Sequence, residues 1–193
     1  VEWIKAQMPR AFNTLVDPNM EVRRIPPAEE VGAPGAYGGA GSKDGSIPGR
    51  FWINLRSTEL HRKYDLADLT YHESIPGHAW EGEFSNRLPL IRSILAFNAF
   101  SEGWALYAEA EMMPHEPIEG QFIAQQFRLL RAARAFLDPA LNLGLMTRDE
   151  AEYVLRDEAL FSPGMTKQEL DRYEFRSPGQ AGSYYYGYRK LID

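Results

Sequence analysis

Residues 71–78 have the sequence Tyr-His-Glu-Ser-Ile-Pro-Gly-His, in which two of the four histidines of the chain lie close together. Zinc hydrolases place two imidazoles and a general base around one metal ion with a related pattern, usually His-Glu-x-x-His on one face of a helix. Here His78 follows His72 by six residues. In a regular helix that spacing is a rotation of roughly 240°. A straight helix would therefore hold the two imidazoles apart.

Pro76 makes a straight helix between the two histidines unfavourable. Its ring would clash with the carbonyl of His72, and it has no backbone N–H to donate, so a helix must distort here. Gly77 permits backbone conformations that other residues avoid. We predict a bulge that absorbs two residues and returns His78 to the ligand position of the usual motif. The alternative is a helix end at Pro-Gly with two solvated or capping histidines.

Glu102 is the candidate third ligand. It lies 24 residues after His78 in Ser-Glu-Gly-Trp-Ala-Leu-Tyr-Ala-Glu, residues 101–109, on a predicted helix. Two His and one Glu form a known catalytic zinc set that leaves a fourth position for water. The alternative is an exposed carboxylate in a first helical turn. Glu109 and Glu81 are candidates to support a ligand histidine from behind, and solvation is the simpler interpretation of both.

Composition excludes several classes of function. The chain has 193 residues, with 21 Lys and Arg against 27 Asp and Glu, and a net charge of −6 argues against a general nucleic-acid binder. With 44% hydrophobic and 25% charged residues it is a folded globular chain. The absence of cysteine excludes disulfides, thiolate metal sites and a cysteine nucleophile. No apolar stretch approaches the roughly twenty residues of a membrane helix, so we predict no membrane span.

Hydrophobic periodicity predicts a mainly α fold with one or two short strands near the N-terminus. The long predicted helices cover residues 1–17 with a break at Pro9, 66–84 with an interruption at Pro76–Gly77, 94–112 and 118–137. Capping-box patterns at 147–150 and 166–169 predict two more helix starts, and Pro178 predicts the start of the last helix.

Two segments near the N-terminus have strand character, residues 21–25 and 51–55. The glycine-rich stretch between them, 32–49, lacks the features of a phosphate-binding loop. We predict that this stretch is a mobile surface loop.

Beyond these patterns, the sequence resembles a known family. Residues 72–78 and 101–109, followed by Arg172-Tyr173 and by 178–184, resemble in the same order the bacterial domain-of-unknown-function family 885. The resemblance runs from about Glu21 to the end, and Glu-Gly-Trp-Ala-Leu-Tyr-Ala-Glu is its most specific element. That family is grouped with gluzincin-type metallopeptidases, which implies a zincin-like helical catalytic domain. Full members are several times longer. Residues 1–193 would then be a single fragment, the catalytic half of a larger protein, whose missing N- and C-terminal helices would be its partners.

The resemblance implies roles for residues of the first motifs. His72, His78 and Glu102 match the ligands of Zn²⁺, and Glu73 matches the general base that activates the zinc-bound water. Many members have a second histidine directly after Pro-Gly-His, where this chain has Ala79, and this difference supports His78 as the ligand.

The resemblance also implies roles near the C-terminus. Tyr184 matches a tyrosine that would steady the oxyanion, and the alternative is a core position, because rings cluster at 184–188. Arg172 matches an arginine that would hold a substrate carboxylate, and the alternative is a surface ion pair with Glu169. Where many members have Asp-Thr-Gly, an apolar residue and His, this chain ends the corresponding stretch in Asn142, which puts in doubt any role borrowed for that residue.

We therefore expect hydrolysis of a peptide or related amide bond, with Glu73 passing a proton from water to the leaving amine. Residues 51–55 could align a peptide substrate as an added strand. Two alternatives stay open. One is a non-catalytic helical domain that binds a peptide or partner, with a vestigial or structural metal site. The other is a fragment that is inactive because missing helices form half of the cleft. The compartment also stays open: bacterial, and periplasmic, secreted or cytoplasmic.

Overall fold

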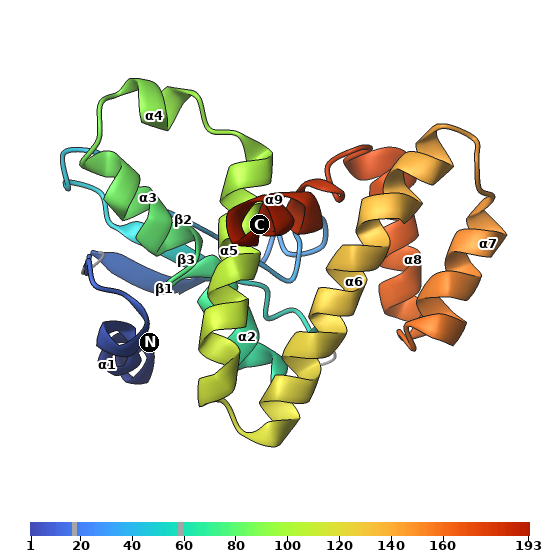
Figure 1. The fold of residues 1–193 in the computed structure, drawn as a ribbon, viewed down its shortest axis with the longest axis horizontal. Helices are drawn as coiled ribbons and strands as arrows, with labels where there is room; N and C mark the ends of the chain where they lie inside the picture. Colours follow the sequence, from blue (N-terminus) through green and yellow to red (C-terminus); the bar gives the residue numbers. More distant parts are fainter. Residues whose placement is uncertain (17–18, 58–59) are drawn as a thin grey trace. The chain divides into compact units, whose positions relative to one another are not determined.

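The chain divides into two compact units. The computed structural model describes residues 1–16, 19–57 and 60–193 (Figure 1). The first unit comprises residues 1–97 and 104–124, and the second comprises 98–103 and 125–193. Helices α5 (Asn98–Met112) and α6 (Ile118–Asn142) therefore contribute residues to both units. Each unit has a hydrophobic core of its own.

The first unit contains a sheet of three strands, β1 (Met20–Arg24), β2 (Ala36–Gly39) and β3 (Gly49–Ile53), in the order β1-β3-β2. The two predicted strands, 21–25 and 51–55, are confirmed as β1 and β3. The third strand, β2, lies inside the glycine-rich stretch that we predicted as a loop, so that prediction is wrong in this part. A Cβ at Gly38 would lie 2.0 Å from the carbonyl oxygen of Glu73, so glycine lets this strand run close to a helix.

The central strand is β3, and its pairing corrects a second expectation. It runs parallel to β1 and antiparallel to β2, so that Phe51 pairs with both Val22 and Gly38. A strand that is paired on both sides has no edge to offer. Residues 51–53 therefore cannot align a substrate as an added strand.

Helices complete the first unit. They are α1 (Glu2–Ala11), α2 (Asp65–Glu73), α3 (His78–Asn86) and α4 (Ile91–Ile94), with part of α5 and the 3₁₀ turn η2 (Met113–His115). The predicted break at Pro9 is wrong, because α1 continues through this residue to Ala11. Residue 17, the predicted end of the first helix, lies outside the described residues. The core of this unit consists of Ile4, Met8, Val16, Tyr71, Ile75, Trp80 and Met112.

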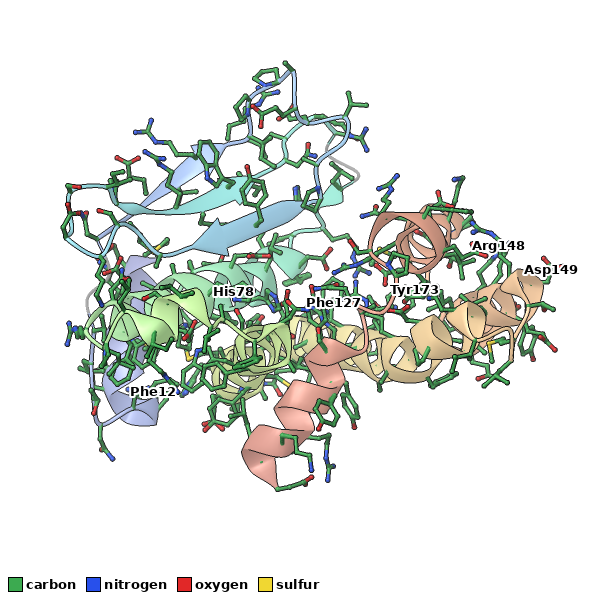
Figure 2. All side chains as sticks on the ribbon, turned by 90° about the horizontal axis from the view of Figure 1, so that it is seen from above. Phe12, His78, Phe127, Arg148, Asp149 and Tyr173 are labelled. Carbon is green, nitrogen blue, oxygen red and sulfur yellow. The ribbon has the colours of Figure 1, made fainter. Side chains whose placement is uncertain are left out.

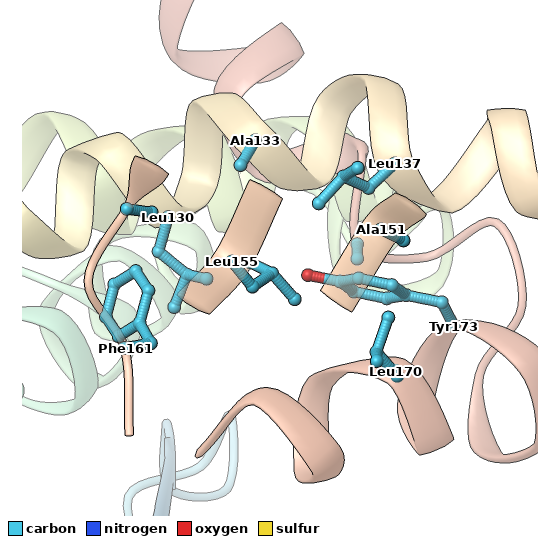
Figure 3. Packing of buried hydrophobic residues seen from close by; sticks show 10 residues of the cluster. Leu130, Ala133, Leu137, Ala151, Leu155, Phe161, Leu170 and Tyr173 are labelled. Atoms are coloured by element: carbon cyan, nitrogen blue, oxygen red, sulfur yellow. The ribbon is translucent and has the colours of Figure 1, made fainter. Parts of the chain in front are cut away.

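The second unit is built from helices. Part of α6 lies with α7 (Arg148–Tyr153), which continues into the π-helix η3 (Val154–Glu158). Next come α8 (Pro163–Asp171), the π-helix η4 (Arg172–Arg176) and α9 (Ser183–Ile192). Figure 3 shows how one face of α6, with Ala133 and Leu137, is directed toward Leu155 and Tyr173 in the core of this unit. The spacing of these α6 residues is that of an amphipathic helix.

Local helix signals were reliable in one of three places. The capping box at Thr147 is present: the Thr147 side chain accepts from the backbone N–H of Glu150, and the Glu150 side chain accepts from the backbone N–H of Thr147. Arg148 and Asp149, which follow Thr147, are labelled in Figure 2. The predicted start at 166–169 is wrong, because Ser162 caps α8 four residues earlier and Thr166 is buried inside the helix. The predicted start at Pro178 is also wrong, since α9 begins at Ser183.

In the described part of the chain, every helix is too short or too polar to cross a membrane.

Candidate metal centre

The chain leaves the helical conformation completely between His72 and His78. Helix α2 ends at Glu73, and α3 begins at His78 with Gly77 as its N-cap. The Ile75–Pro76 peptide bond is cis. This break replaces the bulge that we predicted, because a proline without an N–H and a restricted preceding residue end the first helix altogether. The two imidazole rings lie close together and perpendicular, with centroids 4.9 Å apart at 88° (His78 is labelled in Figure 2).

The break is held by close backbone packing and by a tryptophan. A Cβ at Gly77 would lie 1.8 Å from the carbonyl oxygen of His72 and 2.3 Å from that of Tyr71, so only glycine fits here. Trp104, from the Glu-Gly-Trp motif on α5, donates its indole N–H to the carbonyl of Pro76 at 2.8 Å. The turn between the two histidines is therefore fixed from both sides.

A buried carboxylate orients His72. Its Nδ1 lies 2.6 Å from Oε1 of Glu109, and both side chains are almost fully buried. This contact uses Nδ1 and leaves Nε2 as the ring nitrogen for a metal, the arrangement in which a carboxylate behind a ligand histidine fixes its tautomer. Solvation, the simpler interpretation of Glu109, is therefore wrong. Glu81 instead accepts a hydrogen bond from Ser85 at 2.7 Å.

The three predicted ligands come together. One ligand atom from each of His72, His78 and Glu102 lies within 4.8 Å of the other two. Glu102 is on α5, two residues before Trp104, so the continuous helix carries it beside the turn that Trp104 contacts. Ligand atoms around a tetrahedral zinc ion are about 3.3–3.6 Å apart. Two imidazoles and a carboxylate at this spacing could therefore hold a metal ion.

Glu73 directly follows the first ligand and is 8% exposed. Within residues 1–16, 19–57 and 60–193 its carboxylate accepts no hydrogen bond, although its backbone carbonyl lies against Gly38 of β2. A carboxylate that accepts no hydrogen bond from the described residues can accept one from water.

The surroundings of the His72–Glu109 pair are acidic. Burial raises the pKa of Glu116 to about 7, and the negative charge of Glu109 adds to the effect. Burial, together with the charges of Glu116 and Asp68, also raises the pKa of Tyr71. The carboxylate directly behind His72 is that of Glu109, and a carboxylate on one ring nitrogen favours a cation at the other.

Tyr184 and Arg172, the two candidates from the C-terminal motifs, are in contact. Arg172 Nη2 donates to the Tyr184 hydroxyl at 2.9 Å, and its guanidinium lies 5.5 Å from the centroid of the Tyr184 ring. Arg172 also donates to Oε1 of Gln180, whose Nε2 donates to Oε1 of Glu102 at 3.3 Å. Gln180 thus belongs to the site, and sequence reasoning missed it. The signal was its place in Pro-Gly-Gln, where only the following tyrosine was considered.

The structure bears on the alternative roles of Arg172, as an ion-pair partner of Glu169, and of Tyr184, as a core residue. Glu169 is buried and pairs with Arg134 through two hydrogen bonds of 2.6 and 2.7 Å, so it forms no surface ion pair with Arg172, although the charge of Arg172 helps to lower the pKa of Glu169. Tyr184 is buried, as a core residue would be, but its hydroxyl is bonded to Arg172.

Asn142 has a structural role. Its amide donates to Oδ1 of Asp138 at 2.9 Å and to the carbonyl of Tyr173 at 3.1 Å. Its side chain therefore joins α6 to η4 within the second unit.

Comparison with known proteins places the chain in a family. The model of the family described as "Bacterial protein of unknown function (DUF885)" matches residues 1–193. The chain belongs to DUF885. Among curated proteins, none matches this DUF885 chain.

Two solved structures are similar to this DUF885 chain. One, described as "the putative lipoprotein from Colwellia psychrerythraea", is 34% identical, with a TM-score of 0.89 over 99% of this chain and 34% of its own. The other, described as "a putative lipoprotein of unknown function from Shewanella oneidensis", is 26% identical, with a TM-score of 0.74 over 100% of this chain and 38% of its own. The chain thus spans little more than a third of the length of either relative.

Proposed function

We propose that this chain carries the centre of a zinc-dependent hydrolase of peptide bonds, with a gluzincin-like zinc site. The observation that supports this best is the convergence of His72, His78 and Glu102, with Nδ1 of His72 held by a buried carboxylate. These three side chains would hold the ion. When bound, zinc would polarise the substrate carbonyl and make a bound water acidic near neutral pH.

Glu73 would be the general base. It would take a proton from the attacking water and return it to the leaving amine, so that its carboxylate is regenerated. Its position in the sequence, directly after His72 at the last residue of α2, holds it next to the ligands.

Tyr184 would stabilise the developing oxyanion. Its oxygen accepts a hydrogen bond from Arg172, and a phenol can accept and donate a hydrogen bond at the same time. Arg172 is half-buried, it donates to Gln180 and Tyr184, and its charge also acts on Glu169. Its remaining donors would bind a carboxylate of the substrate.

The edge strand β2 would align the substrate. It pairs with β3 along one side, and within the described residues no strand pairs with its other side. Strand β2 contacts both α2 and α3, the helices that carry the two histidines. An extended peptide added to this edge would run past these helices with its main chain hydrogen-bonded.

The location and partners of the whole protein are part of the proposal. Both solved relatives are described by the words "putative lipoprotein", which supports a place in the bacterial envelope. They are also much longer than this chain, which supports a contribution of further helices to the substrate cleft.

The variant Glu73→Gln tests the mechanism. Loss of the general base should reduce peptidase turnover by about 10²- to 10⁴-fold, while one zinc ion per chain stays bound. Turnover is measured with a fluorogenic peptide and zinc by elemental analysis. Glu119→Gln is the matched control, because Glu119 is an exposed carboxylate in the first turn of α6. Full turnover in Glu73→Gln would discard the mechanism.

A non-catalytic binding domain is the second candidate, and an exposed apolar surface favours it. Around α4, the side chains of Ile94 and Phe97 are 65% and 70% exposed, and Leu90, Ile91 and Leu95 are also exposed. Such a surface usually contacts another protein segment. Stoichiometric zinc without any peptide hydrolysis in a full-length protein would favour this function, with a structural metal site.

A further inference from the structure

We propose that Gln180 is the positioning residue of the site, and that it couples the ligand Glu102 to Arg172 and, through Arg172, to Tyr184. The proposal rests on the proposed zinc site and adds a residue that neither the motif pattern nor the ligand geometry assigns. Both ends of the Gln180 amide are used: Nε2 donates to Glu102, and Oε1 accepts from Arg172. An amide is suited to this place, because it is a neutral group that can donate to a carboxylate and accept from a cation at once.

The backbone around Gln180 is fixed by one buried carboxylate. Asp138 is fully buried, and its two oxygens accept from the N–H groups of the residues on either side of Gln180. Gly179 N lies 2.8 Å from Oδ1, and Ala181 N lies 2.9 Å from Oδ2. Gly179 has φ +79°, a conformation that favours glycine. Charge-assisted bonds of this kind are short and strong, so the side chain between them starts from a fixed position.

A close helix crossing brings α9 to the turn of α5 that carries Glu102. A Cβ at Gly187 would lie 1.7 Å from the carbonyl oxygen of Ala99, and one at Gly103 would lie 2.4 Å from the carbonyl carbon of Gly187. Gly103 directly follows Glu102, and Gly187 lies one turn after Tyr184. The two helices can therefore approach at backbone distance only because neither glycine has a side chain.

The consequence for the ligand is geometric. A carboxylate with Oε1 held by an N–H presents Oε2 to an ion and loses its freedom to rotate. Arg172 holds the other end of the same amide. Disturbing Arg172 should therefore change metal affinity, even though its hydrogen bonds go to Gln180 and Tyr184 and not to a ligand.

The test measures zinc affinity in a double-mutant cycle. Gln180→Met keeps the size of the side chain and removes both hydrogen bonds, and zinc affinity should fall by about 10- to 100-fold. Arg172→Lys keeps the charge and loses the planar fork, and affinity should fall by about two- to tenfold. In the Gln180→Met background, Arg172→Lys should have no further effect. Gln168→Met is the matched control, because Gln168 is exposed on α8.

Zinc dissociation constants are measured by competition with a chromophoric chelator, and Co²⁺ substitution reports the ligand geometry. We expect a changed Co²⁺ spectrum in Gln180→Met and an unchanged one in Gln168→Met. If the unaltered protein binds zinc and Gln180→Met binds it equally well, or if the two substitutions add, the role of Gln180 is refuted and the proposed function stands. If the unaltered protein binds no zinc, both fail. If Gln180→Met does not fold, unchanged zinc affinity in Arg172→Lys alone refutes the coupling.

Discussion

Each unit buries a carboxylate against a nitrogen partner, and the two pairs differ in what the nitrogen partner can still do. In the second unit, Glu169 accepts two bonds from Arg134 and a third from the Tyr173 hydroxyl at 2.8 Å. In the first unit, Glu109 contacts one ring nitrogen of His72 at 2.6 Å. The side chains of both pairs are almost completely buried.

The chemistry of the partner explains the difference. The Arg134 guanidinium donates two hydrogen bonds to the same carboxylate, and it has no acceptor atom with which to bind a metal ion. Burial opposes ionisation of Glu169, but the charge and hydrogen bonds of Arg134 outweigh it and lower the pKa of this carboxyl. An imidazole has two nitrogens, and a carboxylate on the first makes the second a better ligand. Burial depth alone therefore does not distinguish a pair whose nitrogen partner is fully used from one whose second nitrogen could still bind a metal ion.

The largest effect is expected on breaking the pair of the second unit. Arg134→Met leaves Glu169 buried without its hydrogen-bonded cation, and should cost about 3–5 kcal/mol of the free energy of unfolding. Urea denaturation followed by circular dichroism measures it. The exposed pair of Arg156 and Glu152 provides the control, since Arg156→Met should cost less than about 1 kcal/mol. Equal losses in the two variants would show that burial of the Arg134 pair has no energetic weight.

The corresponding change in the first unit should act on metal binding. Glu109→Gln keeps a side chain of similar shape and removes the charge behind His72. Zinc affinity should fall by about 10- to 100-fold, which is about 1.4–2.7 kcal/mol. Chelator competition measures it, and the same titration on Arg134→Met should show a much smaller change. The comparison fails if the Glu109 variant loses folding stability but retains zinc affinity.

Glu116, a buried carboxyl of the first unit, should make folding stability depend on pH. Its pKa is about 7 in the fold, above its ordinary value, so the folded chain keeps a proton that the unfolded chain releases between about pH 4.5 and 7. Stability should therefore fall as pH rises through this window and level off above it. Glu116→Gln should remove that part of the pH dependence and be about 1–2 kcal/mol more stable at pH 8. Urea titrations at pH 5 and 8 test this, and an unchanged pH dependence in the variant would contradict it.

The smallest effect is expected at a site that belongs to neither pair. Thr147 caps α7 with a complete capping box at the surface of the second unit. Thr147→Ala should cost about 1 kcal/mol of folding stability and leave zinc affinity unchanged. Thermal unfolding measures the first and chelator competition the second. A changed zinc affinity would show that the second unit acts on the metal site through its overall stability.

What could be predicted from the sequence was local. The interruption at Pro76–Gly77 follows from the covalent structure of proline, and the cap at Thr147 follows from contacts three residues apart. The mainly helical class follows from periodicity, and it is confirmed. Strand β2 was missed because Gly38 has no strand propensity and is there for its close approach to α2.

The rest of the site depends on partners far away in the sequence. Glu109 contacts a residue 37 positions earlier, and Gln180 contacts one 78 positions earlier. Neither glutamate nor glutamine carries a pattern that distinguishes such a contact from solvation. For Arg172 the sequence left two partners open, a substrate carboxylate and Glu169. The pairing of Glu169 with Arg134 could not be foreseen, because it depends on how α6 and α8 pack within the second unit.

A backbone amide next to the turn at 74–77 provides a way to detect metal binding by hydrogen exchange. Across it, the amide of Trp80 donates to the carbonyl of Ser74 at 3.0 Å, so this proton exchanges with solvent only when the turn opens. A metal ion bound by His72, in the last turn of α2, and by His78, the first residue of α3, would be released whenever this turn opens. Deuterium uptake at Trp80 would therefore slow in proportion to the occupancy of the metal, and it would report binding even in a chain that hydrolyses nothing.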